Sequence, residues 1–146
     1  MIITRTAVES DIEQILVISQ DSISPPWTHG FLLKELYRDD SFFIVAEHDL
    51  DNNIAGFSIL QKFDDDGCLL QIAVEKSFRR AGIGDLLMES ILSIAKNNKL
   101  KSVFLEVRKN NIAAICLYKK HGFKYIRTRK DYYTDPVEDA LVMATT

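Results

Sequence analysis

The sequence has 146 residues, of which 47% are hydrophobic and 27% are charged, and this composition is typical of one globular domain with its own core. The formal net charge of -3 excludes a protein that relies on overall positive charge to bind nucleic acid or an anionic membrane. We therefore expect a single domain over residues 1–146, without direct binding to nucleic acid.

The hydrophobic residues are spread through the chain in short runs. No segment reaches the ~18 consecutive apolar residues of a membrane span. The first residues lack the charged start and long apolar stretch of a signal peptide. We expect a soluble, cytoplasmic protein with no membrane partner.

Two hydrophobic periodicities alternate along the chain, one with the two-residue repeat of strands and one with the three-to-four-residue repeat of helices. In chain order, we expect a strand at 2–7, helices at 9–22 and 31–38, strands at 41–48, 54–63 and 68–75, a helix at 83–99, a strand at 100–108, a helix at 110–122 and strands at 123–133 and 138–145. The order is β-α-α-β-β-β-α-β-α-β-β, and it predicts a mixed α/β domain.

The two cysteines, Cys68 and Cys116, lie in apolar stretches and show neither a CxxC pattern nor the spacing of metal ligands. Their pattern favours small buried side chains over a disulfide or a zinc site. We therefore predict no metal site.

The stretch RRAGIG, residues 79–84, joins an expected strand to an expected helix. A helix that begins at such a turn presents unpaired backbone N–H groups and the positive end of its dipole, which favours an anion. Gly82 and Gly84 allow close approach of the backbone, and Arg79 and Arg80 add positive charge. The turn alone fits either a phosphate site or an ordinary solvated helix entry.

The better-known nucleotide loops do not fit this turn. A P-loop requires Gly-Lys-Ser/Thr, which is absent, and the dinucleotide fingerprint requires a third glycine where Leu87 stands.

The next two elements add polar residues that are candidates for chemistry. Glu106 lies on the strand that follows, and Asn111, Ala114, Ile115 and Tyr118 follow at i, i+3, i+4 and i+7, so that they share one helical face. A single strand Glu is usually a solvated residue and a helical Tyr usually belongs to the core. Combined with the glycine turn, the pattern favours a cleft.

At this point the sequence resembles a known family. RRAGIG matches the Arg/Gln-x-x-Gly-x-Gly/Ala signature of the GCN5-related N-acetyltransferases (GNAT), and the expected element order runs through their whole fold, a mostly antiparallel sheet flanked by helices. Within this superfamily, the segments PWT, IAV, RRAGIG, LEVR, NNIAAICLYKKHGF and DYY…EDALVM resemble the ribosomal-protein-alanine N-acetyltransferases of the RimI type.

The resemblance implies acetyl-CoA as cosubstrate. Its pantetheine would pair with the backbone of Ile72, Ala73 and Val74, and Asn111 would contact it. Its diphosphate would rest on the glycine turn, which comprises Arg79, Arg80, Ala81, Gly82, Ile83 and Gly84, and on Asp85 just after it. Many relatives carry a basic or small residue at the position of Asp85, and a carboxylate beside a diphosphate is unfavourable unless it points away.

The resemblance also assigns roles in the reaction, with Glu106 as the general base and Tyr118 as the general acid. With a pKa of ~4.3, Glu106 is a poor base unless it acts through water, and a phenol with a pKa of ~10 is better suited to hydrogen-bond a thiolate than to protonate it fully. We expect direct transfer with Glu106 acting through water.

The acceptor side is expected from the aromatic and acidic segments around residues 24–28 and 130–139. Trp27, Tyr132, Tyr133 and Asp139 are the candidates for contacts with the substrate, although each also suits an ordinary structural role. The expected partner is a protein N-terminus, the alanine of a small-subunit ribosomal protein, and the expected state is a monomer or weak homodimer. Acetylation of a small-molecule amine, such as a polyamine or an aminoglycoside, and a non-catalytic CoA-binding module are the alternatives.

Overall fold

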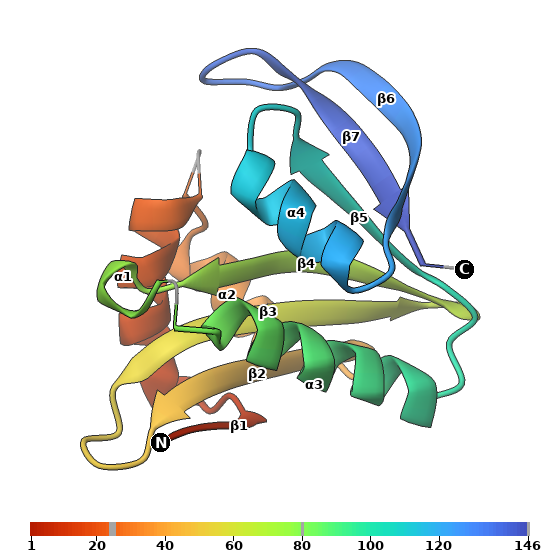
Figure 1. Ribbon diagram of the computed structural model, residues 1–146. Coiled ribbons are helices and arrows are strands. Elements are labelled where there is room, and N and C mark those ends of the chain that lie inside the picture. The colour runs from red at the N-terminus through yellow and green to blue at the C-terminus, as the bar shows by residue number, and fades with distance from the viewer. Residues whose placement is uncertain (24–25, 80, 146) are drawn as a thin grey trace.

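Within residues 1–23, 26–79 and 81–145, which the computed structural model describes, seven strands form one sheet in the order β1-β2-β3-β4-β5-β7-β6 (Figure 1). The strands are β1 (Ile2–Thr6), β2 (Ser41–His48), β3 (Ile54–Phe63), β4 (Asp66–Val74), β5 (Val103–Arg108), β6 (Lys124–Tyr133) and β7 (Glu138–Ala144). The helices are α1 (Ile12–Ser22), α2 (His29–Leu36), α3 (Ile83–Asn97) and α4 (Ile112–Lys120), with 3-10 turns at Glu9–Asp11 and Lys76–Phe78. None of the helices in these ranges is long and apolar enough to cross a membrane.

The element order and the mostly antiparallel sheet predicted from the sequence are confirmed. β4 and β5 form a parallel pair, connected through α3, whereas the other neighbouring strands pair antiparallel. Local signals account for the boundaries. For example, the Thr28 hydroxyl accepts a bond from the Phe31 amide at 3.1 Å and caps α2.

The sheet opens between β4 and β5. Their parallel pairing runs from Gly67↔Val103 to Leu69↔Leu105, and the following residues of β4 remain paired with β3. A bulge at Leu70 lies at the point of separation, because Leu60 pairs with Leu69 while Ile59 pairs with Gln71. Figure 1 shows the two strands diverging from this point.

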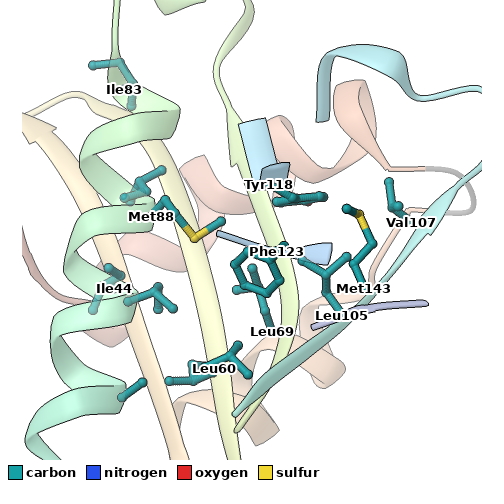
Figure 2. Close-up of a cluster of buried hydrophobic side chains, with 14 of the residues drawn as sticks. Ile44, Leu60, Leu69, Ile83, Met88, Leu105, Val107, Tyr118, Phe123 and Met143 are labelled. Carbon is teal, nitrogen blue, oxygen red and sulfur yellow. The ribbon is translucent and has the colours of Figure 1, made fainter. Parts of the chain in front are cut away.

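Each face of the sheet buries its own hydrophobic cluster. On the face covered by α3 and α4, Leu69, Leu87, Leu105, Tyr118 and Phe123 share one cluster (Figure 2). On the other face, α1 and α2 pack over a second cluster, whose largest buried members are Ile12, Ile15, Leu32, Phe57 and Ile59. The splayed strands are therefore held by two independent cores.

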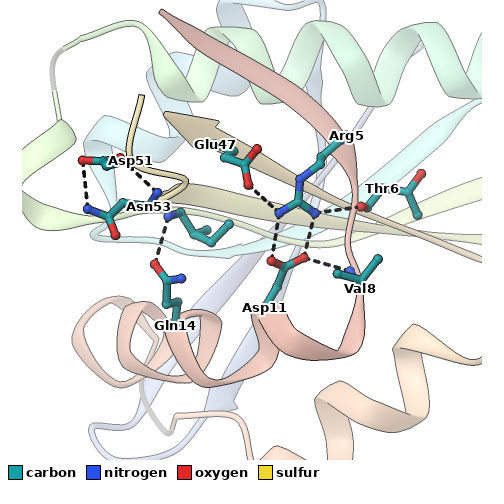
Figure 3. A network of polar contacts seen from close by, with 9 residues as sticks. Arg5, Thr6, Val8, Asp11, Gln14, Glu47, Asp51 and Asn53 are labelled. Carbon is teal, nitrogen blue, oxygen red and sulfur yellow. Dashed lines mark hydrogen bonds and ion pairs between the residues drawn. The ribbon is translucent and has the colours of Figure 1, made fainter. Parts of the chain in front are cut away.

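A buried ion network fastens the N-terminal segment to the sheet (Figure 3). Arg5 on β1 donates to both carboxylate oxygens of Asp11, at 2.8 and 2.9 Å, and to Glu47 on β2 at 2.7 Å. The Val8 amide also donates to Asp11 at 2.8 Å. Burial raises the pKa of Asp11, but the bonds from Arg5 and Val8 outweigh it, so that the pKa lies below its ordinary value.

The cysteines correct one detail of the sequence interpretation. Cys68 is half-buried on β4, whereas Cys116 on α4 is exposed rather than buried, and both thiols are free. Cys116 faces outward because the neighbouring Ile115 and Tyr118 of α4 face the core.

Candidate active site

A cleft of about 640 Å³ lies where β4 and β5 separate, between the exposed edge of β4, the start of α3 and the inner side of α4. Most residues of the predicted coenzyme site line it: Ile72, Ala73, Val74, Arg79, Gly82, Ile83, Gly84, Asp85, Asn111 and Tyr118. Ala81 is exposed and does not belong to the lining, and Arg80 lies outside the described residues. Gln71, Phe78, Ala114 and Leu117 complete much of the wall.

The start of α3 has the form of an anion cradle. Gly82 is its N-cap with φ at 79°, a left-handed conformation that favours glycine, and no side chain from the described residues caps the helix. A Cβ on Gly84 would lie 3.2 Å from Leu117 Cδ2, so a larger residue here would press on the Leu117 side chain of α4. The uncapped amides and the helix dipole suit the diphosphate of CoA.

The edge of β4 that lines the cleft carries main-chain groups that form hydrogen bonds with nearby side chains. The Ile72 amide donates to Oε1 of Gln71 at 3.1 Å, and Nε of Arg79 donates to the Val74 carbonyl at 3.3 Å. Both partners are side chains rather than a neighbouring strand, so an extended amide-bearing ligand such as pantetheine can replace them without breaking the sheet. The edge therefore fits the strand-like contact expected for the coenzyme.

Asp85, the acidic residue beside the cradle, is paired. Its Oδ1 lies 2.7 Å from Nε2 of His121 and 3.0 Å from Nζ of Lys120, both at the C-terminal end of α4. The bonds from His121 and Lys120 hold the pKa of Asp85 below its ordinary value. The carboxylate is thus oriented toward Lys120 and His121, and the positive charge of Lys120 reduces its repulsion of a diphosphate.

Tyr118 joins the core to the cleft. Its side chain is only 5% exposed and packs with its ring centroid 5.9 Å from that of Phe123 (Figure 2). Burial, followed by the proximity of Tyr133, raises the pKa of its phenol, so the hydroxyl stays protonated at physiological pH. No hydrogen bond from the described part of the chain reaches this hydroxyl, and Tyr118 lines the cleft, so a ligand there can accept a hydrogen bond from it.

Asn111 begins the same helix. Its side chain accepts a bond from the Ala114 amide at 3.2 Å and so caps α4, while the residue lines the cleft. The predicted shared face is present for Ala114, Ile115 and Tyr118. Asn111 itself precedes the first helical residue, Ile112.

Glu106 lies on the other side of the sheet from Tyr118. Leu105 and Val107 pack with Tyr118 in one cluster, so the alternation of β5 directs Glu106 to the opposite face. There, Oε2 of Glu106 accepts a bond from Arg129 on β6 at 2.6 Å. Glu106 does not belong to the cleft lining.

Two of the predicted acceptor residues lie near Glu106. Tyr132 and Tyr133 pack edge to face with ring centroids 5.1 Å apart, and Tyr132 lies 4.2 Å below the guanidinium of Arg129. Burial raises the pKa of Tyr133 to about 12, with a further contribution from Glu106. The structure therefore groups Glu106 with this tyrosine pair.

The other two acceptor candidates have structural contacts. Trp27 packs on Phe31 and Phe57, with ring centroids 4.7 and 6.3 Å away, on the side of α1 and α2. Asp139 accepts a bond from the Asp131 amide at 2.9 Å and so closes the β6–β7 hairpin. Their roles toward a substrate remain predictions.

Sequence reasoning did not identify Gln71, Lys120, His121 or Arg129 as parts of the site. A basic helix end and a basic strand are common features, so the local pattern does not indicate their partners. His121 pairs with Asp85, 36 residues away, and Arg129 pairs with Glu106, 23 residues away. Only the tertiary packing reveals these pairs.

Comparison with known proteins agrees with this geometry. The Acetyltransferase (GNAT) family matches residues 12–123. An N-alpha-acetyltransferase of Sulfolobus acidocaldarius is 34% identical, covering 96% of this chain and 89% of its own, and a ribosomal protein bS18-alanine N-acetyltransferase of Haemophilus ducreyi is 30% identical, covering 96% and 97%.

Solved structures show the same fold. The ribosomal-protein-S18-alanine N-acetyltransferase of Escherichia coli superposes with a TM-score of 0.90 at 28% identity, covering 99% of this chain and 93% of its own. An N-acetyltransferase of Thermoplasma acidophilum, solved with coenzyme A, superposes with a TM-score of 0.81 at 21% identity, covering 100% and 99%. With its sequence match, its splayed sheet and its uncapped helix at the cleft, the chain belongs to the GNAT family of N-acetyltransferases.

Proposed function

We propose that this N-acetyltransferase takes its acetyl group from acetyl-CoA and transfers it to the N-terminal α-amine of a protein, with the N-terminal alanine of a small-subunit ribosomal protein as the first candidate. The observation that carries the proposal is the position of Tyr118, which is buried and lines the cleft, and whose hydroxyl makes no hydrogen bond with the described residues. The relatives named for bS18-alanine and for N-alpha acetylation support the choice of acceptor.

The coenzyme would be held by the main chain of β4 and by the start of α3, with Asn111 beside its pantetheine. When bound, it supplies an acyl group activated as a thioester. The Ile72 amide, which donates to Gln71 here, is a candidate donor for the thioester oxygen as that oxygen gains charge. Gln71 would have to release this amide first.

The acceptor amine would approach from the opposite face, where Glu106 lies with Tyr132 and Tyr133. At pH 7.5 roughly a third of α-amines with a pKa near 7.8 are neutral, against about 0.1% of lysine side chains with a pKa of ~10.4. An N-terminal amine therefore needs only a weak base, and Glu106 would remove its proton through a bound water after attack.

Tyr118 would stabilise the leaving thiolate by donating a hydrogen bond. Its raised phenol pKa makes full proton transfer to a thiolate unfavourable, while it keeps the donor hydrogen in place across the physiological range. Glu106 and Tyr118 would thus act on opposite faces of β5, Glu106 on the amine and Tyr118 on the sulfur.

The test is to incubate the protein with acetyl-CoA and peptides that begin with Ala, Ser or Met, together with a free polyamine and an aminoglycoside. Mass spectrometry then shows which of these acceptors gains an acetyl group. We expect the Ala-starting peptide to be acetylated fastest. A peptide whose N-terminus is already blocked, but which contains one lysine, is the matched control and should stay unmodified.

Acetylation of free amines without any peptide would contradict the proposal and favour the small-molecule alternative. Binding of coenzyme A without transfer to any amine would favour a non-catalytic module.

A further inference from the structure

An ion pair holds the carboxylate proposed as the general base. Nη1 of Arg129 donates to Oε2 of Glu106 at 2.6 Å, and the two side chains are 46% and 31% exposed, respectively. The pair is therefore accessible from solvent on the face from which an acceptor would approach.

The register of the sheet explains how Arg129 reaches Glu106 across a strand. β7 lies between β5 and β6, and Ala140 on β7 pairs with Arg108 on one side and with Arg129 on the other. Paired residues share a face, so Arg129 lies on the same face as Arg108 and Glu106. Ala140 is fully buried and small, which leaves room for the guanidinium to pass over it toward Glu106.

Arg129 also connects Glu106 to the tyrosine pair. Its guanidinium carbon lies 4.2 Å from the centroid of Tyr132, and Tyr133 is covered in the same way by Arg108 at 4.4 Å. Arg108 in turn bonds Glu138 at 3.2 Å, which ties the hairpin to β5. The contact to Glu106 raises the pKa of Arg129, so the arginine stays charged.

Several charged and titratable groups share the face of Glu106. Arg129, Tyr132 and Tyr133 act on it from β6, and Cys68 acts on it from β4. Two more arginines lie on this face by register, Arg108 on β5, which bonds Glu138, and Arg127 on β6. Arg129 is the arginine that donates to Glu106, so it decides whether the acceptor meets a bare carboxylate or a neutral ion pair.

We propose that Arg129 is a positioning residue that orients Glu106 over the tyrosine pair and, by neutralising its charge, makes the acceptor site select a neutral amine over an ammonium ion. A bare carboxylate attracts an ammonium ion, whereas a carboxylate already paired with arginine attracts it much less. The site would thereby favour an N-terminal α-amine over a lysine side chain. This inference rests on the proposed function, because it assumes that Glu106 serves the acceptor.

The test is a double-mutant cycle with Arg129→Gln, Glu106→Gln and the combined variant, measured with an Ala-starting peptide. Loss of one charge-assisted bond should lower kcat by about tenfold in Arg129→Gln, with the KM for acetyl-CoA unchanged because the coenzyme cleft lies on the other face. In the Glu106→Gln background the same change should have little further effect. Arg129→Lys, which keeps the charge, should recover part of the activity.

The matched control is Arg127→Gln, which removes a charge from the same strand and face, where the residue pairs with Val142. It should leave kcat unchanged. Three outcomes would each overturn the positioning role. The first is an equal loss of kcat in Arg127→Gln, and the second is an unchanged kcat in Arg129→Gln. The third is a full loss of kcat from Arg129→Gln in both the wild-type and the Glu106→Gln backgrounds.

Selectivity gives a second readout. In Arg129→Gln, acetylation of the lysine in an N-terminally blocked peptide should rise relative to acetylation of the Ala-starting peptide. The dependence of kcat on pH should change along with this ratio. An unchanged ratio would overturn the selectivity. If the wild-type protein acetylates only free amines, the proposed function fails, and the same cycle on that amine still decides whether Arg129 acts through Glu106.

Discussion

The carboxylate of Asp85 lies one residue beyond the glycine turn, where a negative charge would repel a diphosphate. Its bonds to His121 and Lys120 give the carboxylate two partners at the C-terminal end of α4. These contacts explain how an acidic residue is tolerated beside the cradle, because the local charge is compensated.

Substitutions of Asp85 and of Lys120 should change the affinity for coenzyme A in opposite directions. Asp85→Asn should tighten binding of coenzyme A about two- to fivefold, since it removes the repulsion and releases Lys120, and Lys120→Gln should weaken binding by a similar factor. Isothermal titration calorimetry measures both, and higher salt should diminish both effects. Weaker binding by Asp85→Asn would show instead that the carboxylate supports the geometry of the cradle.

Tyr118 gives the second prediction at the scale of a residue. Tyr118→Phe keeps the ring that packs on Phe123 and removes only the hydroxyl, so kcat should fall by at least about tenfold while coenzyme A binds almost as before. Steady-state kinetics and calorimetry separate the two quantities. Tyr125→Phe, which alters an exposed tyrosine on β6, serves as the control, and equal kcat in both variants would remove Tyr118 from the mechanism.

At the scale of elements, the spacing of β3 and β4 sets the floor of the cleft. A Cβ on Gly56 of β3 would lie 2.7 Å from the carbonyl oxygen of Ala73, a backbone atom that can move only with β4. The position of β4 therefore depends on a glycine in the strand behind it.

Gly56→Ala should lower the free energy of unfolding by about 1–3 kcal/mol and weaken the binding of coenzyme A, because β4 must shift where the pantetheine would pair. Gly30→Ala is the contrast: a Cβ on Gly30 in α2 meets no atom within 4 Å, so this change should stabilise the protein by about 0.5–1 kcal/mol. Chemical denaturation measures both variants. Equal stability of the two would contradict the close approach at Gly56.

At the scale of the whole molecule, the network of Arg5, Asp11 and Glu47 joins the first strand to the sheet and to the turn before α1 (Figure 3). The Asp11 side chain is only 7% exposed, so the pair is shielded from solvent more than a surface ion pair.

Asp11→Asn should reduce the free energy of unfolding by about 1–3 kcal/mol at pH 7, because the bonds to Arg5 lose their charge. The pKa of Asp11 is lower in the folded protein than its ordinary value of 3.8, so its contribution is present above that value and is lost as the pH falls through the folded pKa. Thermal unfolding between pH 3 and 7 should show the difference between wild type and variant shrinking in acid. If the stability difference between wild type and Asp11→Asn stayed constant over this range, which brackets the usual titration of carboxyl groups, the linkage would be contradicted.

The sequence by itself determined the elements and their order, from the first strand to the hairpin of β6 and β7, because periodicity and capping act over three or four neighbouring residues. The resemblance to a family further indicated most residues that line the cleft. Only the tertiary structure decided that Glu106 and Tyr118 lie on opposite faces of β5, that Asp85 meets α4, and that Arg129 crosses Ala140 to reach Glu106. These contacts depend on how strands and helices distant in sequence pack around a sheet that opens at the Leu70 bulge, and no local pattern carries that information.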